Sequence, residues 1–224
     1  FGLTVHVSFL THSTTSVSIL LLTFLVPAVA FGAIAGVFVD RYDRRRILVW
    51  TNVARGLLFL LLILFDQQIA LLFLITAIVA TLTTFFAPAE TAMTPLVVKR
   101  DQLLTANGLF VLGLQASFAL GFAVLGPLVL KVTGVNPLIA IVAGLYLVAG
   151  LLCWTLPPAP APLGSGGGST VSQAGAAVRA TLSQLRDGLV YIKDHRPIFW
   201  ALTYLTITSS LIGVLGVLGP AFAK

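Results

Sequence analysis

The side chains best suited to chemistry in this sequence are charged residues set among long apolar runs. The densest group lies in 36–46, Gly-Val-Phe-Val-Asp-Arg-Tyr-Asp-Arg-Arg-Arg, between the apolar runs 16–39 and 47–65. Glu90 and Arg55 are isolated charges in apolar surroundings. Arginine and carboxylate side chains in such places form ion pairs or bind charged groups. The pattern in 36–46 indicates a tight polar turn between two membrane-crossing helices.

Motifs for covalent or metal chemistry are absent from the sequence. The glycine-rich segment 164–168 lacks the lysine of a phosphate-binding loop, and no two of the three histidines have metal-ligand spacing on a shared helix. The single Cys153 lies inside an apolar run, so no disulfide forms within the chain. We therefore expect no cofactor, no metal site and no enzymatic activity.

The composition indicates an all-α integral membrane protein. The chain is 58% hydrophobic and 9% charged, with a mean hydropathy of +1.05, whereas about a quarter of the residues of a soluble domain are charged. The net charge of +6 does not indicate a nucleic-acid partner, because the positive residues stand in short clusters between apolar segments. That arrangement encodes membrane topology.

The apolar runs predict seven helices in three regions. Region 1–157 is an amino-terminal transmembrane bundle, 158–196 a linker, and 197–224 the start of a second bundle. The predicted helices cover 1–10, 16–39, 47–65, 69–98, 103–130, 138–156 and 197–222. The first is too short to span a bilayer, which takes about 20 residues. The chain also begins with Phe1 and ends at Lys224 just as a helix does, so we expect a fragment at both ends.

The linker has two parts of different composition. Residues 157–170 are rich in proline and then in glycine and serine, which is typical of a spacer. From 171 to 195 apolar residues recur every three or four positions, which predicts an amphipathic helix. Those apolar residues are Val178, Leu182, Leu185, Leu189 and Ile192.

The basic residues predict the orientation in the membrane. Ten of the 13 lysines and arginines fall on the side that holds 41–46, 99–100 and the linker. By the positive-inside rule that side is cytoplasmic. We expect a multi-pass protein of a cell membrane, the bacterial inner membrane, with a cytoplasmic linker.

Several motifs resemble the major facilitator superfamily. Gly36, Asp40, Arg41, Arg44 and Arg45 fall on the places of its loop motif G-x-x-x-D-R-x-G-R-R, and Asp43 replaces the second glycine. Segments resembling the macrolide-efflux and enterobactin-exporter branch are 85–90 (FFAPAE), 106–108 (ANG), 125–127 (LGP) and 220–224 (PAFAK). Two departures weaken the inference of proton-driven export. The fifth-helix antiporter motif is half present, and the fourth helix lacks the arginine of many proton antiporters.

The resemblance implies a secondary active transporter that works by alternating access. We predict proton-driven export of an amphipathic small molecule, with the lipid bilayer and the carboxy-terminal half of the same protein as further partners. Two alternatives are a non-transporting scaffold or sensor and an uptake carrier of the same superfamily.

The resemblance also implies a conformational gate at the charged turn. Asp40 would face a helix amino end in the second half, and Arg44 would pair with an acid on the fourth helix. Glu90 fits that acid, because the 22 positions from Gln68 span about 33 Å, close to the hydrocarbon thickness. The alternative is that these charges only fix topology. The gate residues are Gly36, Asp40, Arg41, Arg44, Arg45 and Glu90.

Three further features are candidates for substrate binding or helix bending. Arg55 lies about 13 Å into the membrane, counted from Arg46, and no acid in the six helices matches that depth. It either pairs with polar groups or binds an anionic substrate. Phe85, Phe86 and Gln115 either line a substrate cavity or pack in the core or against lipid. Bending or close packing of the fifth helix is expected at Gly121, Gly126 and Pro127.

Overall fold

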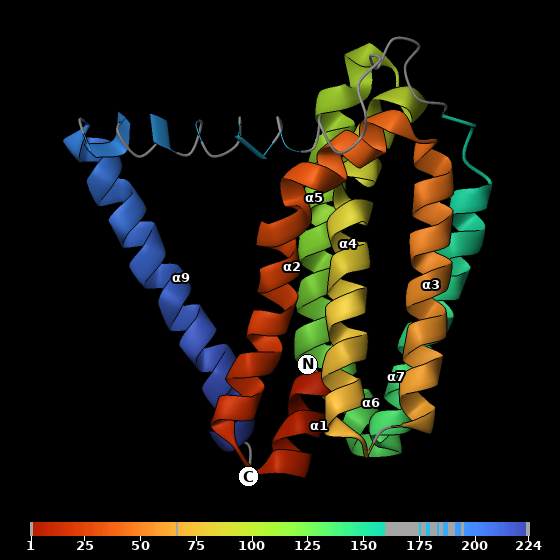
Figure 1. Cartoon of the computed structure of the whole chain (residues 1–224), viewed down its shortest axis with the longest axis vertical. Helices are drawn as coiled ribbons and strands as arrows, with labels where there is room; N and C mark the ends of the chain where they lie inside the picture. The colour runs from red at the N-terminus through yellow and green to blue at the C-terminus, as the bar shows by residue number, and fades with distance from the viewer. Residues whose placement is uncertain are drawn as a thin grey trace.

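The chain folds into a bundle of long helices (Figure 1). The computed structural model describes residues 2–65, 67–159, 175, 178–179, 183, 186–187, 191–193 and 195–222, with the backbone alone for 212–222. The elements are α1 (Gly2–Thr11), α2 (Thr14–Arg41), α3 (Arg44–Leu64), α4 (Ile69–Val97), η1 (Arg100–Gln102), α5 (Leu103–Ala119), η2 (Leu120–Leu125), α6 (Gly126–Thr133), α7 (Val135–Trp154) and α9 (Arg196–Phe222).

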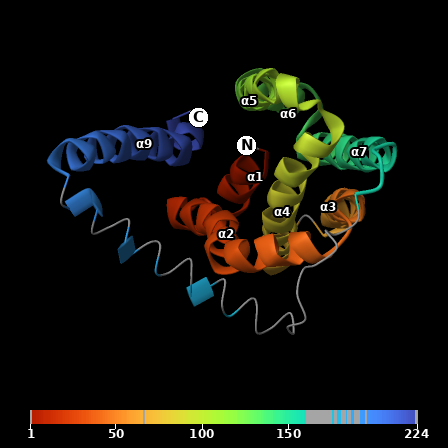
Figure 2. The same ribbon diagram turned by 90° about the horizontal axis from the view of Figure 1, so that it is seen from above.

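The helices alternate in direction along the chain. The charged turn after α2, the start of α5 and the end of α7 meet at one end of the bundle, which we call the basic end (Figure 1). Seen from above, α3 lies beside both α4 and α7, α2 packs on α4, and α5 stands farther out (Figure 2). The helix α9 leans away from the bundle, and its main contacts are with the lower parts of α1 and α2.

The predicted all-helical fold is confirmed, with small shifts of the helix ends. The third helix begins at Arg44, earlier than the predicted 47, because Asp43 caps it. The fifth predicted helix continues to Thr133 as α5, η2 and α6. The predicted amphipathic helix over 171–195 falls largely outside the described residues. Among the described residues, five helices are long and apolar enough to cross a membrane.

The buried core consists of two apolar clusters separated by a polar layer. One cluster, toward the end opposite the basic end, includes Leu20, Phe59 and Leu72. The other, at the basic end, includes Leu48 and Met93. Between them on α3 lie the buried polar residues of the layer, Thr51, Asn52 and Arg55. In contrast, α5 has no buried side chain, and most of its apolar surface is available to lipid or to further protein.

Candidate functional site

The charged turn is organised by Asp43, the residue that replaces the glycine of the family motif. Its Oδ1 accepts hydrogen bonds from the backbone N–H groups of Arg45 at 3.0 Å and Arg46 at 3.4 Å. Its Oδ2 lies 3.8 Å from the Arg46 Nε. Asp43 is therefore the N-cap of α3, and a carboxylate there also complements the positive end of the helix dipole.

Removal of this cap gives the first prediction. Asp43→Ala is expected to lower the free energy of unfolding by about 1 kcal/mol, because two N–H groups of α3 lose their acceptor. Asp43→Gly restores the motif glycine. It is expected to lower the free energy of unfolding by only roughly a few tenths of a kcal/mol, since glycine is tolerated at N-caps. Denaturant unfolding of the reconstituted protein measures both. Equal losses for the two variants would contradict the capping role.

Two arginines, Arg44 and Arg45, join the start of α3 to the end of α7 and the residues that follow it. The Arg45 guanidinium donates to the carbonyl oxygen of Trp154, the last residue of α7, and lies 5.6 Å from the centroid of the Trp154 ring. The Arg44 backbone N–H donates to the carbonyl of Ala159 at 3.2 Å. A cation at a helix carboxyl end is favourable, so these contacts stabilise the α3 and α7 pair at the basic end.

The polar layer is built around Arg55, whose side chain is only 4% exposed. Its Nε donates to the Thr51 carbonyl at 3.1 Å, one terminal nitrogen to the Asn52 Oδ1 at 2.9 Å, and the other to the Thr83 Oγ1 at 3.4 Å. The guanidinium carbon lies 4.3 Å from the Phe86 ring centroid and 4.8 Å from that of Tyr146. We call this set the Arg55 cluster: Thr51, Asn52, Arg55, Thr83, Phe86 and Tyr146.

The cluster draws on three helices, α3, α4 and α7. Tyr146 of α7 is itself stacked on Phe59 of α3, with ring centroids 5.6 Å apart. The Asn52 Nδ2 donates to the Cys153 Sγ at 3.6 Å. An arginine with hydrogen bonds to a carbonyl and two polar side chains, and with aromatic rings beside it, meets the requirement that an intramembrane cation be paired or solvated.

Two glycines allow α3 and α7 to approach closely enough for these contacts. A Cβ added at Gly56 would lie 2.8 Å from the Leu147 Cδ2 and 3.1 Å from the Ala143 carbonyl oxygen. One added at Gly150 would lie 3.1 Å from the Val53 Cγ2. Small residues have this role between membrane helices, where close backbone approach improves packing.

A substitution at Gly56 tests this close packing. Gly56→Ala is expected to lower the free energy of unfolding by about 1–3 kcal/mol, because the new methyl group overpacks the contact with α7. The matched control is Gly144→Ala on α7, where a Cβ meets nothing within 4 Å. It is expected to be neutral or stabilising, since alanine favours helix over glycine. Thermal unfolding in detergent measures both, and equal behaviour of the two variants would contradict the packing role.

Glu90 lies on the same face of α4 as the Arg55 cluster. It is half-buried and follows Phe86 by four residues and Thr83 by seven, so all three share one helix face. Arg55 attracts the Glu90 carboxylate electrostatically. Within residues 2–65 and 67–159, no ion pair joins Glu90 to Arg44 or Arg45. The predicted pairing at the basic end stays a prediction.

The remaining gate residues lie where α2 ends. Asp40 is exposed and Arg41 half-buried. Arg44 is also half-buried, and its Nε is buried without a hydrogen-bond acceptor among the described residues. A Cβ at Gly36 would meet nothing within 4 Å. The described part of the chain therefore leaves this surface of α2 open.

The predicted aromatic and amide candidates are not brought together. Phe86 contacts Arg55, whereas the Phe85 ring lies edge-on against Phe38 of α2, with centroids 5.4 Å apart. Gln115 is exposed on α5, and no hydrogen bond joins it to the described residues of α4. Of these three residues, only Phe86 belongs to the Arg55 cluster.

The fifth predicted helix departs from α geometry where bending was expected. Residues Leu120–Leu125 form a π-helical turn, and the Gly126 N–H donates to the Gly121 carbonyl, five residues earlier. Pro127 follows at the start of α6 and has no N–H to donate. Because a proline ring crowds the carbonyl four residues before it, a wider turn ahead of Pro127 relieves the clash.

A hollow opens between α4 and the start of α5 at the basic end. Its volume is about 430 Å³, within the range of about 300–1,000 Å³ typical of small-molecule sites. The lining combines hydroxyl and amide groups with apolar side chains: Thr91, Thr94, Pro95, Leu103, Leu104, Asn107 and Phe110. Such a lining suits an amphipathic ligand.

The comparison with protein families decides the classification. The model of the Major Facilitator Superfamily matches residues 2–224. The chain belongs to this superfamily. It is therefore a multi-pass membrane protein of a transporter family, as the charged-turn motif and the apolar helices indicate.

Curated relatives of this superfamily chain are distant. It is 26% identical over 180 residues to the uncharacterized MFS-type transporter YkuC of Bacillus subtilis, covering 78% of this chain and 40% of that protein. It is 30% identical over 141 residues to macrolide efflux protein A of Streptococcus pyogenes, covering 59% of this chain and 34% of that protein. The chain thus spans less than half the length of these relatives. No solved structure matches.

Several residues of the polar layer and of the contact between α3 and α7 were not identified from the sequence. They are Asn52, Tyr146 and Cys153 of the polar layer, and the close-packing glycines Gly56 and Gly150. Asn52 carries a detectable signal, because it lies one turn before Arg55 and shares its helix face. Tyr146 and Cys153 carry none, since their position opposite α3 depends on how α7 is rotated.

Proposed function

We propose that this chain is the amino-terminal half, with the first helix of the second half, of a secondary active exporter of amphipathic small molecules. Superfamily membership and the similarity to macrolide efflux protein A support export. The observation that carries the substrate class is the hollow between α4 and α5, which joins apolar side chains to hydroxyl and amide groups. We further propose that the proton gradient drives transport.

Alternating access requires no covalent step, because the two halves rock around a central site. The six gate residues would control this motion at the basic end, which we assign to the cytoplasm from its excess of lysine and arginine. Two observations support the gate: Asp40 is exposed at the end of α2, and Glu90 is a half-buried carboxylate on α4. The binding partner for Asp40 would come from the second half.

An efflux assay on the complete reading frame tests the proposal. In bacteria that lack their main exporters, expression is expected to lower the retention of a labelled macrolide, and a protonophore is expected to abolish the difference. Unchanged retention under both conditions overturns transport and favours a scaffold or sensor. Raised retention indicates an uptake carrier. Lowered retention that ignores the protonophore keeps export and overturns proton coupling.

A further inference from the structure

A second hollow lies on the outer side of the bundle, at the basic end of the α3 and α7 pair. Its volume is about 390 Å³, again within the range of about 300–1,000 Å³ of ligand sites. It shares no lining residue with the hollow between α4 and α5. The lining residues are Asp43, Arg45, Arg46, Val49, Trp50, Trp154 and Pro158; we call this hollow the Trp-Arg groove.

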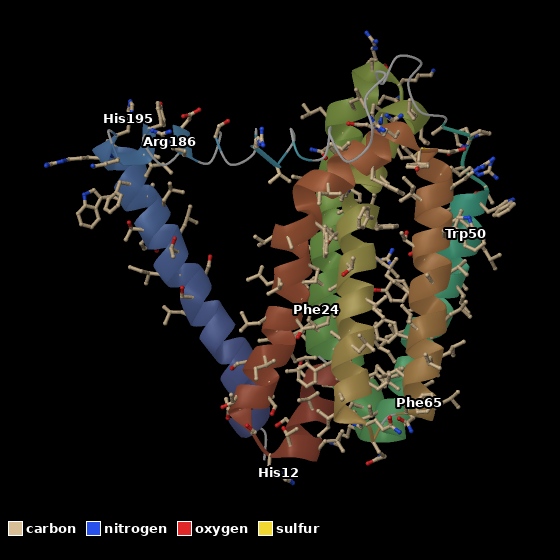
Figure 3. The ribbon with its side chains drawn as sticks, viewed as in Figure 1. His12, Phe24, Trp50, Phe65, Arg186 and His195 are labelled. Carbon is tan, nitrogen blue, oxygen red and sulfur yellow. The ribbon has the colours of Figure 1, made fainter. Side chains whose placement is uncertain are left out.

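The aromatic residues of the groove are exposed in a way typical of a membrane interface. Trp50 is 68% exposed and Trp154 64% exposed; Trp50 lies in the second turn of α3, and Trp154 is the last residue of α7. Figure 3 shows Trp50 on the outward side of α3. Tryptophan is enriched where hydrocarbon meets headgroups, because its ring is apolar while its N–H needs a polar partner. The groove therefore lies at headgroup depth.

The charge of the groove is positive. The Arg46 side chain is 81% exposed. Trp50 lies four residues later, so the two side chains share one face of α3. The Arg45 guanidinium lies over the Trp154 ring. The one acid, Asp43, is occupied by capping α3 and by its contact with Arg46. Arginine in this setting favours phosphate, which it binds with several donors at once.

The surface below the groove is apolar. Along the outward side of α3, Leu57 is 55% and Leu64 75% exposed, and on α7 Leu151 is 70% exposed. A molecule seated on the groove would meet arginines at its polar end and leucines along its length. That combination matches a phospholipid, and the positive charge matches an anionic one.

We propose that the Trp-Arg groove binds the headgroup of an anionic phospholipid, with the acyl chains lying along α3 and α7. Basic pockets between membrane helices recognise such headgroups. Because Arg45 also joins α3 to α7, a bound lipid would reinforce the contact between these helices. The binding does not depend on which substrate the protein transports or in which direction.

Tryptophan quenching by brominated lipids tests the site in this chain. The chain has three tryptophans, so Trp200→Phe leaves only Trp50 and Trp154, both in the groove. Detergent-solubilised protein is titrated with phosphatidylglycerol or phosphatidylcholine carrying brominated acyl chains. Phosphatidylglycerol is expected to half-saturate quenching at a mole fraction at least about tenfold lower, since each nearby arginine contributes about fivefold.

Three variants locate the effect. Arg46→Gln is expected to lower the preference for phosphatidylglycerol about fivefold, and Arg46→Lys is expected to keep most of it. Arg100→Gln, an exposed arginine at the same end, is the matched control and is expected to change nothing. Equal quenching by the two lipids, or an equal loss in Arg100→Gln, would overturn the site. Displacement of phosphatidylglycerol by millimolar inorganic phosphate would assign the groove to a free anion and overturn the lipid proposal.

Discussion

Replacing Arg55 with alanine is expected to destabilise the bundle by roughly 3–5 kcal/mol, the cost typical of breaking a buried charged network. The substitution removes three hydrogen bonds and two cation–aromatic contacts. Hydrogen bonds in membranes contribute about 0.6 kcal/mol each, and desolvated cation–π contacts about 2. Truncation also leaves a cavity where α3, α4 and α7 meet.

One term opposes this loss. A buried cation costs about 2.5–3.5 kcal/mol, and alanine relieves that cost. Arg55→Met separates charge from volume, because methionine fills much of the same space and its sulfur packs well against Phe86 and Tyr146. It is expected to cost only about 1 kcal/mol, because the relieved cost of burying the charge offsets the lost hydrogen bonds, and the sulfur–aromatic contacts replace part of the lost cation–aromatic energy. Arg55→Lys is expected to fall between the two, because lysine keeps the charge and loses the planar stacking.

Unfolding in mixed detergent, followed by circular dichroism, measures the three variants. Wild-type stability in Arg55→Ala would show that the cluster does not hold the helices together. The alternative role, binding an anionic substrate, has its own signature. A stable Arg55→Met variant that has lost only the transport of anionic compounds would assign Arg55 to substrate binding. The hydrogen bonds that Arg55 already makes, and the aromatic rings beside its guanidinium, favour the structural role.

The helices could be predicted because their signal is local. Apolar runs of about 20 residues and the charges between them define where each membrane segment begins and ends. The charged turn shows the limit of this signal. Asp43 was recognised as a departure from the family motif, but its role as the cap of α3 depends on backbone geometry that a motif does not specify.

The packing between helices could not be predicted, because it depends on their rotation. Arg55 was predicted to need polar partners, and Thr51 and Asn52 lie within one turn of it. Its contacts with Phe86 and Tyr146 come from helices far away in sequence. The depth of Glu90 was counted from Gln68 alone. Counted from the other end of α4, at Val97, Glu90 lies seven residues, about 10 Å, inside the helix.

The position of Glu90 leads to the prediction with the largest effect on function. Glu90→Gln is expected to lower transport by the complete protein about tenfold and to shift it toward the state open at the basic end. The gate proposal requires a carboxylate that pairs with Arg44 when this end is closed, and an ion pair of that kind contributes on the order of 1.4 kcal/mol, a tenfold change in population. Glutamine keeps the shape and removes the charge.

Opening of the basic end is measured by the reaction of one introduced cysteine with a membrane-impermeant thiol reagent. The single native Cys153 is replaced by alanine, and Asn107→Cys places the probe in the hollow between α4 and α5. Glu90→Gln is expected to raise the labelling rate about tenfold, matching the population shift. Unchanged labelling and unchanged transport would contradict the gate.

A double-mutant cycle decides which arginine Glu90 acts through. If the gate operates, Glu90→Gln and Arg44→Gln are expected to be non-additive in the labelling rate, because each removes the same interaction. If Glu90 instead stabilises the Arg55 cluster, Glu90→Gln and Arg55→Met are expected to be non-additive. The non-additivity then appears in the free energy of unfolding and not in the labelling rate. The attraction between Glu90 and Arg55 suggests how both can hold. A carboxylate that keeps a partner inside the bundle can leave Arg44 without being stranded as an unpaired charge, so opening of the basic end costs less.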